Sequence, residues 1–115
     1  MRQKFNVILL GEVWDFLDTL DEKSKEKILY NIEKAKYVNN PELFKKIEDV
    51  IWEFRTKYKK THYRLLSFWD KTDKTDTLVI ATHCIIKKKG KISKTEVEKA
   101  RVIMKQYLEE KQKKR

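Results

Sequence analysis

The sequence predicts an α+β fold, in which an antiparallel sheet of about four strands is combined with an N-terminal helical hairpin and a C-terminal helix. The period of the apolar residues changes from two to about 3.6 and back, in the order strand, two helices, three strands, helix. The chain of 115 residues, with two glycines and one proline, is long enough for one ordered core. We therefore expect a single domain over residues 1–115, with a basic tail at 109–115 that frays.

The N-terminal part predicts one strand and two helices. "KFNVILL" is apolar and partly β-branched, which is typical of a strand, and Gly11 ends it. Apolar residues from Val13 onward recur at helical spacing in two stripes, and a polar stretch from Asp21 to Ser24 separates them. "NNP" ends the second helix, because the residue before Pro41 is disfavoured in the α region.

The C-terminal part predicts three strands and a helix. The strand candidates are rich in aliphatic and aromatic residues and read KKIEDVIWEFRTKY, THYRLLSFWD and TLVIATHCIIKK. "DKTDKTD" predicts a polar hairpin loop between the last two, and we expect the first strand of the chain to pair inside this meander. "SKTE" has the form of a capping box at the start of the last helix, with Ser93 and Glu96 each satisfying the other's backbone N–H.

Charge is distributed unevenly along the chain. Residues 1–54 contain 9 Lys/Arg and 11 Asp/Glu, a net charge of −2, whereas residues 55–115 contain 19 and 7, a net charge of +12. Such a field attracts polyanions, with nucleic acid the commonest partner, and it also attracts an acidic protein.

Composition predicts neither a membrane protein nor a metalloprotein. Cys84 has no second cysteine for a disulfide, and no charged-then-apolar leader opens the chain, so we expect a cytoplasmic location. No apolar run approaches the roughly 20 residues that span a bilayer. Two histidines and one cysteine are too few for a zinc site, and two isolated glycines form no phosphate loop, so we expect no metal and no cofactor.

Arg64 stands out in the third strand candidate. Alternation places it with Leu66 and Phe68 on one face of the strand, opposite Tyr63 and its neighbours. An arginine among apolar side chains is costly unless it has a partner or a function. Two interpretations stay open, a structural ion pair with a partner such as Glu53 and a functional guanidinium.

Two further segments concentrate positive charge. Residues 55–69 contain no acid, and spacing of two places Arg55, Lys57 and Lys59 on one side of an extended segment, beside Lys60. The second segment, "KKKGK" at residues 87–91, precedes the last helix, whose N-terminus favours a phosphate. Each segment is either a phosphate-binding surface or a solvated loop. If they are functional, we expect the two segments to converge on one pocket.

His62 and His83 are the only side chains whose reference pKa suits proton transfer at neutral pH. His83 lies at the end of the last strand candidate, next to the lysine-rich segment. It is either a satisfied structural residue or a catalytic base.

Three motifs together resemble a known family. "IWEFR", "YRLLSF" and "ATHCIIKKKGKISKTEVEKA", in this order, are similar to the RelE/HigB superfamily of bacterial toxins, particularly its phage-derived, HigB-like branch. Members of that branch carry Trp-Glu-Leu-Arg, Tyr-Arg and a Phe-x-Lys-Lys-x-x-Lys segment before the last helix. The resemblance covers nearly the whole chain and is weakest in the first 40 residues.

The resemblance implies a ribosome-dependent mRNA endonuclease that inhibits translation. It also implies a cognate antitoxin, often a helix-turn-helix DNA-binding protein, as the second partner besides mRNA on the ribosome. Arg64 corresponds to the family's phosphate-contacting arginine, and Lys87, Lys88 and Lys91 correspond to its RNA-facing segment. The chain departs from the family where Ile85 replaces an aromatic residue, where Ser93 replaces a common proline, and where a tyrosine of the last helix is absent.

RNA can be cleaved without a metal, because its 2′-hydroxyl attacks the adjacent phosphate once a base removes the proton. Under this hypothesis Arg64 and Lys57 clamp the phosphate, Lys87 is a clamp or the acid, and His83 is the base. The remaining RNA-binding candidates are Arg55, Lys59, Lys60, Lys88 and Lys91. Two alternatives stay open, a noncatalytic ParE-like toxin that inhibits DNA gyrase and a basic nucleic-acid-binding module.

Overall fold

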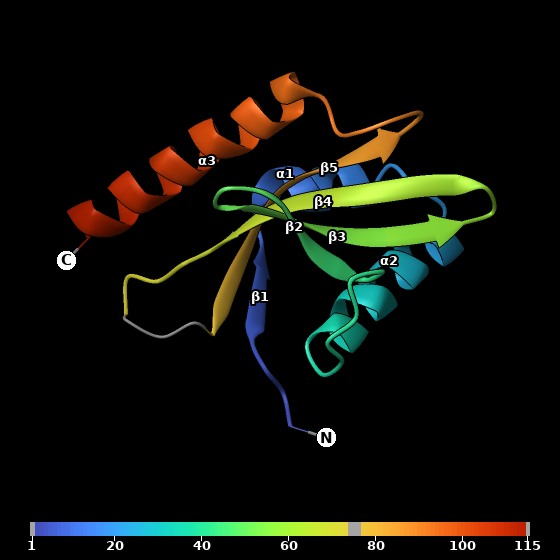
Figure 1. Cartoon of the computed structure of the whole chain (residues 1–115), viewed down its shortest axis with the longest axis horizontal. Helices are drawn as coiled ribbons and strands as arrows, with labels where there is room; N and C mark the ends of the chain where they lie inside the picture. The colour runs from blue at the N-terminus through green and yellow to red at the C-terminus, as the bar shows by residue number, and fades with distance from the viewer. Residues whose placement is uncertain (1, 74–76, 115) are drawn as a thin grey trace.

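The computed structural model describes residues 2–73 and 77–114 of the chain (Figure 1). These residues form a five-stranded sheet and three helices, which confirms the α+β class. In chain order the elements are β1 (Asn6–Leu9), α1 (Gly11–Leu17), α2 (Glu22–Ala35), β2 (Phe44–Glu48), β3 (Ile51–Tyr58), β4 (Thr61–Trp69), β5 (Leu78–Lys87) and α3 (Lys94–Lys113).

The sheet is mixed and has the strand order β1-β5-β4-β3-β2. The strands β2, β3, β4 and β5 pair with one another in antiparallel order. At one edge β1 runs parallel to β5, with Asn6 opposite Leu78. The prediction of about four antiparallel strands was therefore wrong, and so was the placement of β1 inside the meander. Helices α1 and α2 carry the chain from β1 to β2 at the opposite edge, and an apolar run alone does not encode the direction of its pairing.

The additional strand comes from the segment KKIEDVIWEFRTKY, which was expected to be one strand. It forms two, because the chain reverses at Asp49 and Val50, and Glu48 pairs with Ile51. Asp49 adopts a φ of 46°, a left-handed conformation that aspartate tolerates better than most residues. Apolar residues continue on both sides of this turn, and it contains no glycine, proline or asparagine, so no typical turn residue marked it.

Helices cover both faces of the sheet (Figure 1). Helices α1 and α2 pack against β5 and β3 over the larger core cluster, which includes Leu17, Ile28 and Leu65. Helix α3 covers the other face over a smaller cluster that includes Leu66 and Val97. The alternation predicted for β4 is confirmed, because neighbouring residues of that strand belong to the two different clusters.

The two N-terminal helices are separated at residues 18–21, and the side chain of Asp21 accepts a hydrogen bond from the Ser24 N–H at 3.3 Å. Their pairing as a hairpin stays a prediction. Residues 74–76 of the expected polar loop lie outside the described residues. Within the described parts of the chain, no helix is long and apolar enough to cross a membrane.

Helix α3 is held to the sheet at both ends. At its start the Ser93 Oγ accepts from the Glu96 N–H at 3.3 Å, as the capping box predicts, but the Glu96 carboxylate contacts His83 of β5. Toward its end, buried Asp70 accepts hydrogen bonds from the Tyr107 hydroxyl and the Lys111 ammonium, both at 2.7 Å. The helix continues to Lys113, so residues 109–113 are helical, and fraying of the tail stays a prediction.

Candidate functional site

Basic side chains of three neighbouring strands share the sheet face that α3 covers. In the antiparallel register Lys57 of β3 lies opposite His62 of β4, and His62 lies opposite Lys87 of β5. Directly opposite residues project to the same face, with Cβ atoms about 5 Å apart. These three residues form what we call the cationic row, in which an imidazole stands between two lysine side chains.

A pocket of about 480 Å³ opens beside this row, between the β2–β3 hairpin and the segment of residues 87–94. Its acidic lining residues are Glu48 and Glu53. Its basic lining residues, which define the cationic pocket, are Lys45, Lys46, Arg55, Lys87, Lys91 and Lys94. Lys87 belongs to both the row and the pocket, so the two basic segments of the sequence meet in space.

Arg64 lies beneath this pocket instead of lining it. Only 3% of the residue is exposed, and its Nε lies 3.3 Å from Oε1 of buried Glu53. Its Nη1 donates a hydrogen bond to the Tyr63 carbonyl at 3.1 Å. Burial lowers the pKa of Arg64, and Glu53 opposes that shift, so the guanidinium remains charged. The ion pair with Glu53, one of the two interpretations left open by the sequence, is present.

Arg55, one of the predicted RNA-binding residues, lines the pocket directly. Its Nε lies 3.7 Å from Oε2 of Glu53, and its Nη1 is 3.5 Å from the Pro41 carbonyl oxygen. The side chain is 28% exposed and lines the pocket. Glu53 therefore stands between a buried arginine and a pocket-lining arginine, and the buried one can influence the other through this shared carboxylate.

His62 is half-buried within the cationic row. Its pKa is lowered first by desolvation and then by the positive charges of Arg64, Lys57 and Lys87. The imidazole is therefore neutral at neutral pH and can accept a proton. From the sequence, His62 was identified as a titratable group without a predicted role. Its spacing of two from Arg64 nevertheless places both residues on the same face of β4.

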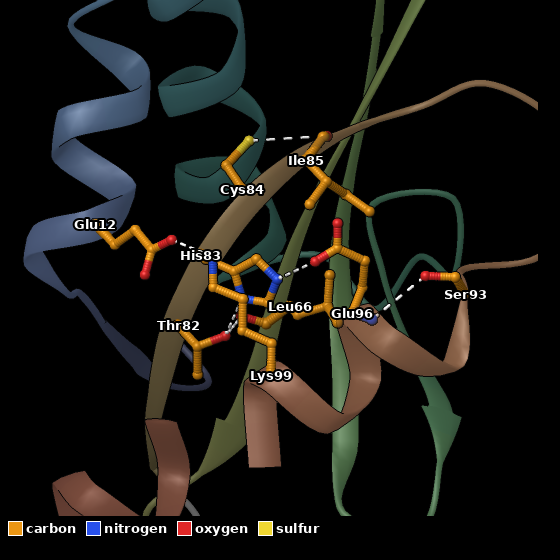
Figure 2. Close-up of polar contacts among 9 residues, drawn as sticks. All are labelled: Glu12, Leu66, Thr82, His83, Cys84, Ile85, Ser93, Glu96 and Lys99. Carbon is orange, nitrogen blue, oxygen red and sulfur yellow. Dashed lines mark hydrogen bonds and ion pairs between the residues drawn. The ribbon is translucent and has the colours of Figure 1, made fainter. Parts of the chain in front are cut away.

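His83, the predicted base, is enclosed beneath α3 (Figure 2). Only 2% of it is exposed, its Nε2 lies 3.1 Å from Oε1 of Glu96, and its Nδ1 lies 3.0 Å from Oγ1 of Thr82. Burial lowers the pKa of His83 despite the opposing effect of Glu96. Lys99 of α3 is ion-paired with Glu12 of α1 beside this cluster (Figure 2). The geometry therefore gives His83 a role in docking α3 and does not bring it to the pocket.

The remaining predicted RNA-binding residues fall into two groups. Lys91 lines the cationic pocket, whereas exposed Lys88 precedes it in the same loop. Lys59 and Lys60 form the exposed β3–β4 turn, with φ values of 48° and 67°. This two-residue turn with two positive φ values is a geometry that normally favours asparagine and glycine.

Lys45 and Lys94 are pocket residues that were not predicted from the sequence. Lys45 belongs to β2, which was not predicted as a separate strand, and it lies opposite Glu53 of β3. Lys94 opens α3 and lines the pocket from the other side. No local sequence signal identifies them, because both positions depend on how β2 and the start of α3 approach each other.

Cys84 lies on the opposite face of the sheet, in the core under α1 and α2. Burial raises the pKa of its thiol to about 12, so it is not a nucleophile at neutral pH. Over residues 2–73 and 77–114, no three His, Cys, Asp or Glu side chains are grouped to hold a metal ion. Beside the pocket, the imidazole of His62 can transfer a proton, and the lysines and Arg55 of the pocket can stabilise negative charge.

The chain matches the model of a known protein family. The model of the family described as "Phage derived protein Gp49-like (DUF891)" matches residues 15–105, which span most of the chain and include the cationic row and pocket. No curated protein matches the chain significantly.

Proposed function

The chain belongs to the phage-derived, Gp49-like protein family of RelE/HigB-like toxins, and from this premise we propose that it is a toxin that cleaves mRNA on the ribosome. Proteins of this family are commonly the toxins of toxin–antitoxin systems. The finer assignment, a ribosome-dependent endonuclease of the HigB-like branch, rests on the cationic row and the pocket beside it.

The observation that carries the proposal is the neutral imidazole of His62 between Lys57 and Lys87. Cleavage of RNA by its own 2′-hydroxyl needs a base for one proton, an acid for another, and cations for the charge that accumulates on the phosphate. The row supplies one imidazole and two ammonium groups on adjacent strands, which hold them in fixed register.

His62 is the base in this mechanism and replaces His83, which is enclosed. Its imidazole removes the 2′-hydroxyl proton, the 2′-oxygen forms a bond to phosphorus, and the bond from phosphorus to the 5′-oxygen breaks. The Lys87 ammonium donates a proton to the leaving 5′-oxygen. The products are a 2′,3′-cyclic phosphate and a 5′-hydroxyl, so every atom and proton is accounted for without a metal ion or water in the cleavage step.

Arg55 and Lys57 hold the phosphate while its negative charge increases, with Lys91 and Lys88 along the adjoining RNA backbone. Arg64 acts through Glu53, which orients the Arg55 guanidinium. Acid–base assistance contributes about 10²–10⁴-fold, and each preorganised donor about 10²–10³-fold. The ribosome supplies the alignment of the mRNA, which can contribute about 7–11 kcal/mol.

The proposal is tested by adding the purified protein to a translation system and mapping the 5′ ends of the mRNA. We expect cuts in register with the reading frame, and we expect far fewer on the same mRNA without ribosomes. Intact transcripts in the presence of active ribosomes would reject the ribonuclease. If intact transcripts were accompanied in cells by a DNA-damage response, the result would favour a noncatalytic gyrase inhibitor over the ribonuclease.

The matched control pair is Lys57→Ala and Lys105→Ala. Both remove one lysine, but Lys105 is exposed on α3 and lines none of the described pockets. We expect the first to lose at least about tenfold in cleavage rate and the second to keep the parental rate. Equal loss in both would assign the effect to total charge instead of the row.

A further inference from the structure

A second, larger cavity lies on the far side of the β2–β3 turn from the cationic pocket. It has a volume of about 800 Å³ and lies between that turn, the end of β4 and the C-terminal half of α3. Its apolar walls, which define the aromatic groove, are Val50, Trp52, Trp69, Met104 and Leu108. The mechanism above uses none of these residues.

A smaller cavity of about 300 Å³ adjoins the aromatic groove near the end of α2. Trp52 and Trp69 line both cavities, and Phe5 and Phe44 add apolar wall to the smaller one. An extended chain can place one apolar side chain in each of these two neighbouring cavities.

The rim of the groove is basic. Lys46 borders the larger cavity, and Lys4 borders the smaller one. The single lining carboxylate, Asp49, is already bound by the Arg101 guanidinium at 3.1 Å. An occupant that complements this site therefore carries apolar side chains for the walls and negative charge for the rim.

We propose that the aromatic groove binds an acidic, apolar peptide segment of the antitoxin, an assignment that rests on the proposed function for the identity of the partner. The groove contains no residue of the cationic row, and it shares only Lys46 with the cationic pocket. Leucine or aromatic side chains of the segment enter the cavities, and its Asp or Glu residues face the lysines of the rim.

RNA is a poorer occupant for two structural reasons. One face of Trp52 is already stacked on Phe44, at 5.0 Å and 24°, and its remaining neighbour Trp69 meets it edge-on at 84°. The carboxylates of Glu48, Asp49 and Glu98 surround Arg101 at the turn that separates the groove from the cationic pocket. An RNA strand leaving the cationic pocket would have to pass this acidic cluster.

The test selects peptides from a random display library on the full-length protein. Binding is then measured through tryptophan fluorescence in a Trp14→Phe background, which leaves Trp52 and Trp69 as reporters, because the chain contains three tryptophans. We expect the selected peptides to combine apolar residues with flanking Asp or Glu and to change the fluorescence on binding. Basic peptides, or the absence of any enriched peptide, would overturn the proposal.

A matched pair of substitutions locates the binding site. Val50→Glu places a carboxylate at the groove, whereas Val102→Glu places one on the outer side of α3, and the two valines are similarly exposed at 43% and 53%. We expect peptide affinity to fall at least about tenfold in the first variant and to stay unchanged in the second. Equal affinity in both would overturn the groove as the site.

Oligouridylate serves as the RNA probe in the same fluorescence assay. A change caused by this oligonucleotide and not by the acidic peptides would overturn the peptide assignment and make the groove an RNA site. The fluorescence readout does not require mRNA cleavage. A lack of peptide binding at the groove and a lack of ribonuclease activity are therefore separate results.

Discussion

Removal of the buried Arg64 guanidinium has a calculable effect on stability. Arg64 and Glu53 are both at least 94% buried as side chains, and their closest contact is 3.3 Å. Arg64→Met keeps most of the side-chain volume but leaves the Glu53 carboxylate without its nearest cation. Breaking a buried ion pair in this way costs about 3–5 kcal/mol.

The lower end of that range applies here, because Arg55 remains 3.7 Å from the same carboxylate. We therefore expect a loss of about 3 kcal/mol, out of about 5–15 kcal/mol for a domain of this kind. With a urea dependence of about 1.5–2 kcal/mol per M, the midpoint of unfolding shifts down by about 1.5–2 M.

The assay is urea unfolding followed by far-ultraviolet circular dichroism, with Glu53→Gln/Arg64→Met as the matched double variant. Because the double variant leaves no unpaired buried charge, and Arg55, which also loses Glu53, is partly exposed, we expect it to recover at least half of the lost stability. A midpoint within about 0.3 M of the parent for Arg64→Met alone would refute the role of this ion pair. A double variant no more stable than the single one would assign the loss to packing.

Three further predictions concern other parts of the molecule. Asp70→Asn should lower stability by about 2 kcal/mol at pH 7 in urea unfolding. Burial opposes ionisation of Asp70, but hydrogen bonds from Lys111, Tyr107 and Thr72 lower its pKa well below 3.8, so the difference should shrink as the pH falls below about 4 and through that lowered value. Lys60→Gly should raise stability by about 1 kcal/mol in thermal unfolding, because the φ of 67° is strained for lysine and not for glycine, and an unchanged midpoint would contradict this. The cleavage rate should fall as the pH drops through the lowered pKa of His62, below its ordinary value of 6.5, because only the neutral imidazole accepts the 2′-hydroxyl proton; a rate that does not fall at any pH below 6.5 at which the protein stays folded would exclude His62 as the base.

The elements whose period is regular could be predicted from the sequence. The alternation along β4 separated Leu65 from Leu66 correctly, and the "SKTE" motif identified the start of α3 through Ser93. The β2–β3 turn could not be predicted in the same way, because no glycine, proline or asparagine marks it and apolar residues continue on both sides of Asp49. The parallel partner of β1 depends on the path of two helices across the sheet, which no local pattern encodes.

The candidate site was predictable in its location but not in the roles of its residues. Alternation placed Arg64 with Leu66 on one face of β4, and the same spacing of two reaches His62, for which no role was predicted. The missing information was the position of α3, which encloses His83 through Glu96 and leaves His62 beyond its N-terminal end. A sequence that predicts which face a side chain occupies does not predict which part of that face a helix covers.

We propose that the His62 imidazole, between two lysines, is the base with which this protein cleaves mRNA on the ribosome. The most direct test compares His62→Gln with His83→Gln, both confirmed as folded, on translating ribosomes, and analyses the ends of the RNA products. We predict 2′,3′-cyclic phosphate ends from the parent, at least about a hundredfold slower cleavage by His62→Gln, and near-parental cleavage by His83→Gln. The opposite pattern, with His62→Gln fully active and His83→Gln inactive, would contradict the assignment of His62 as the base.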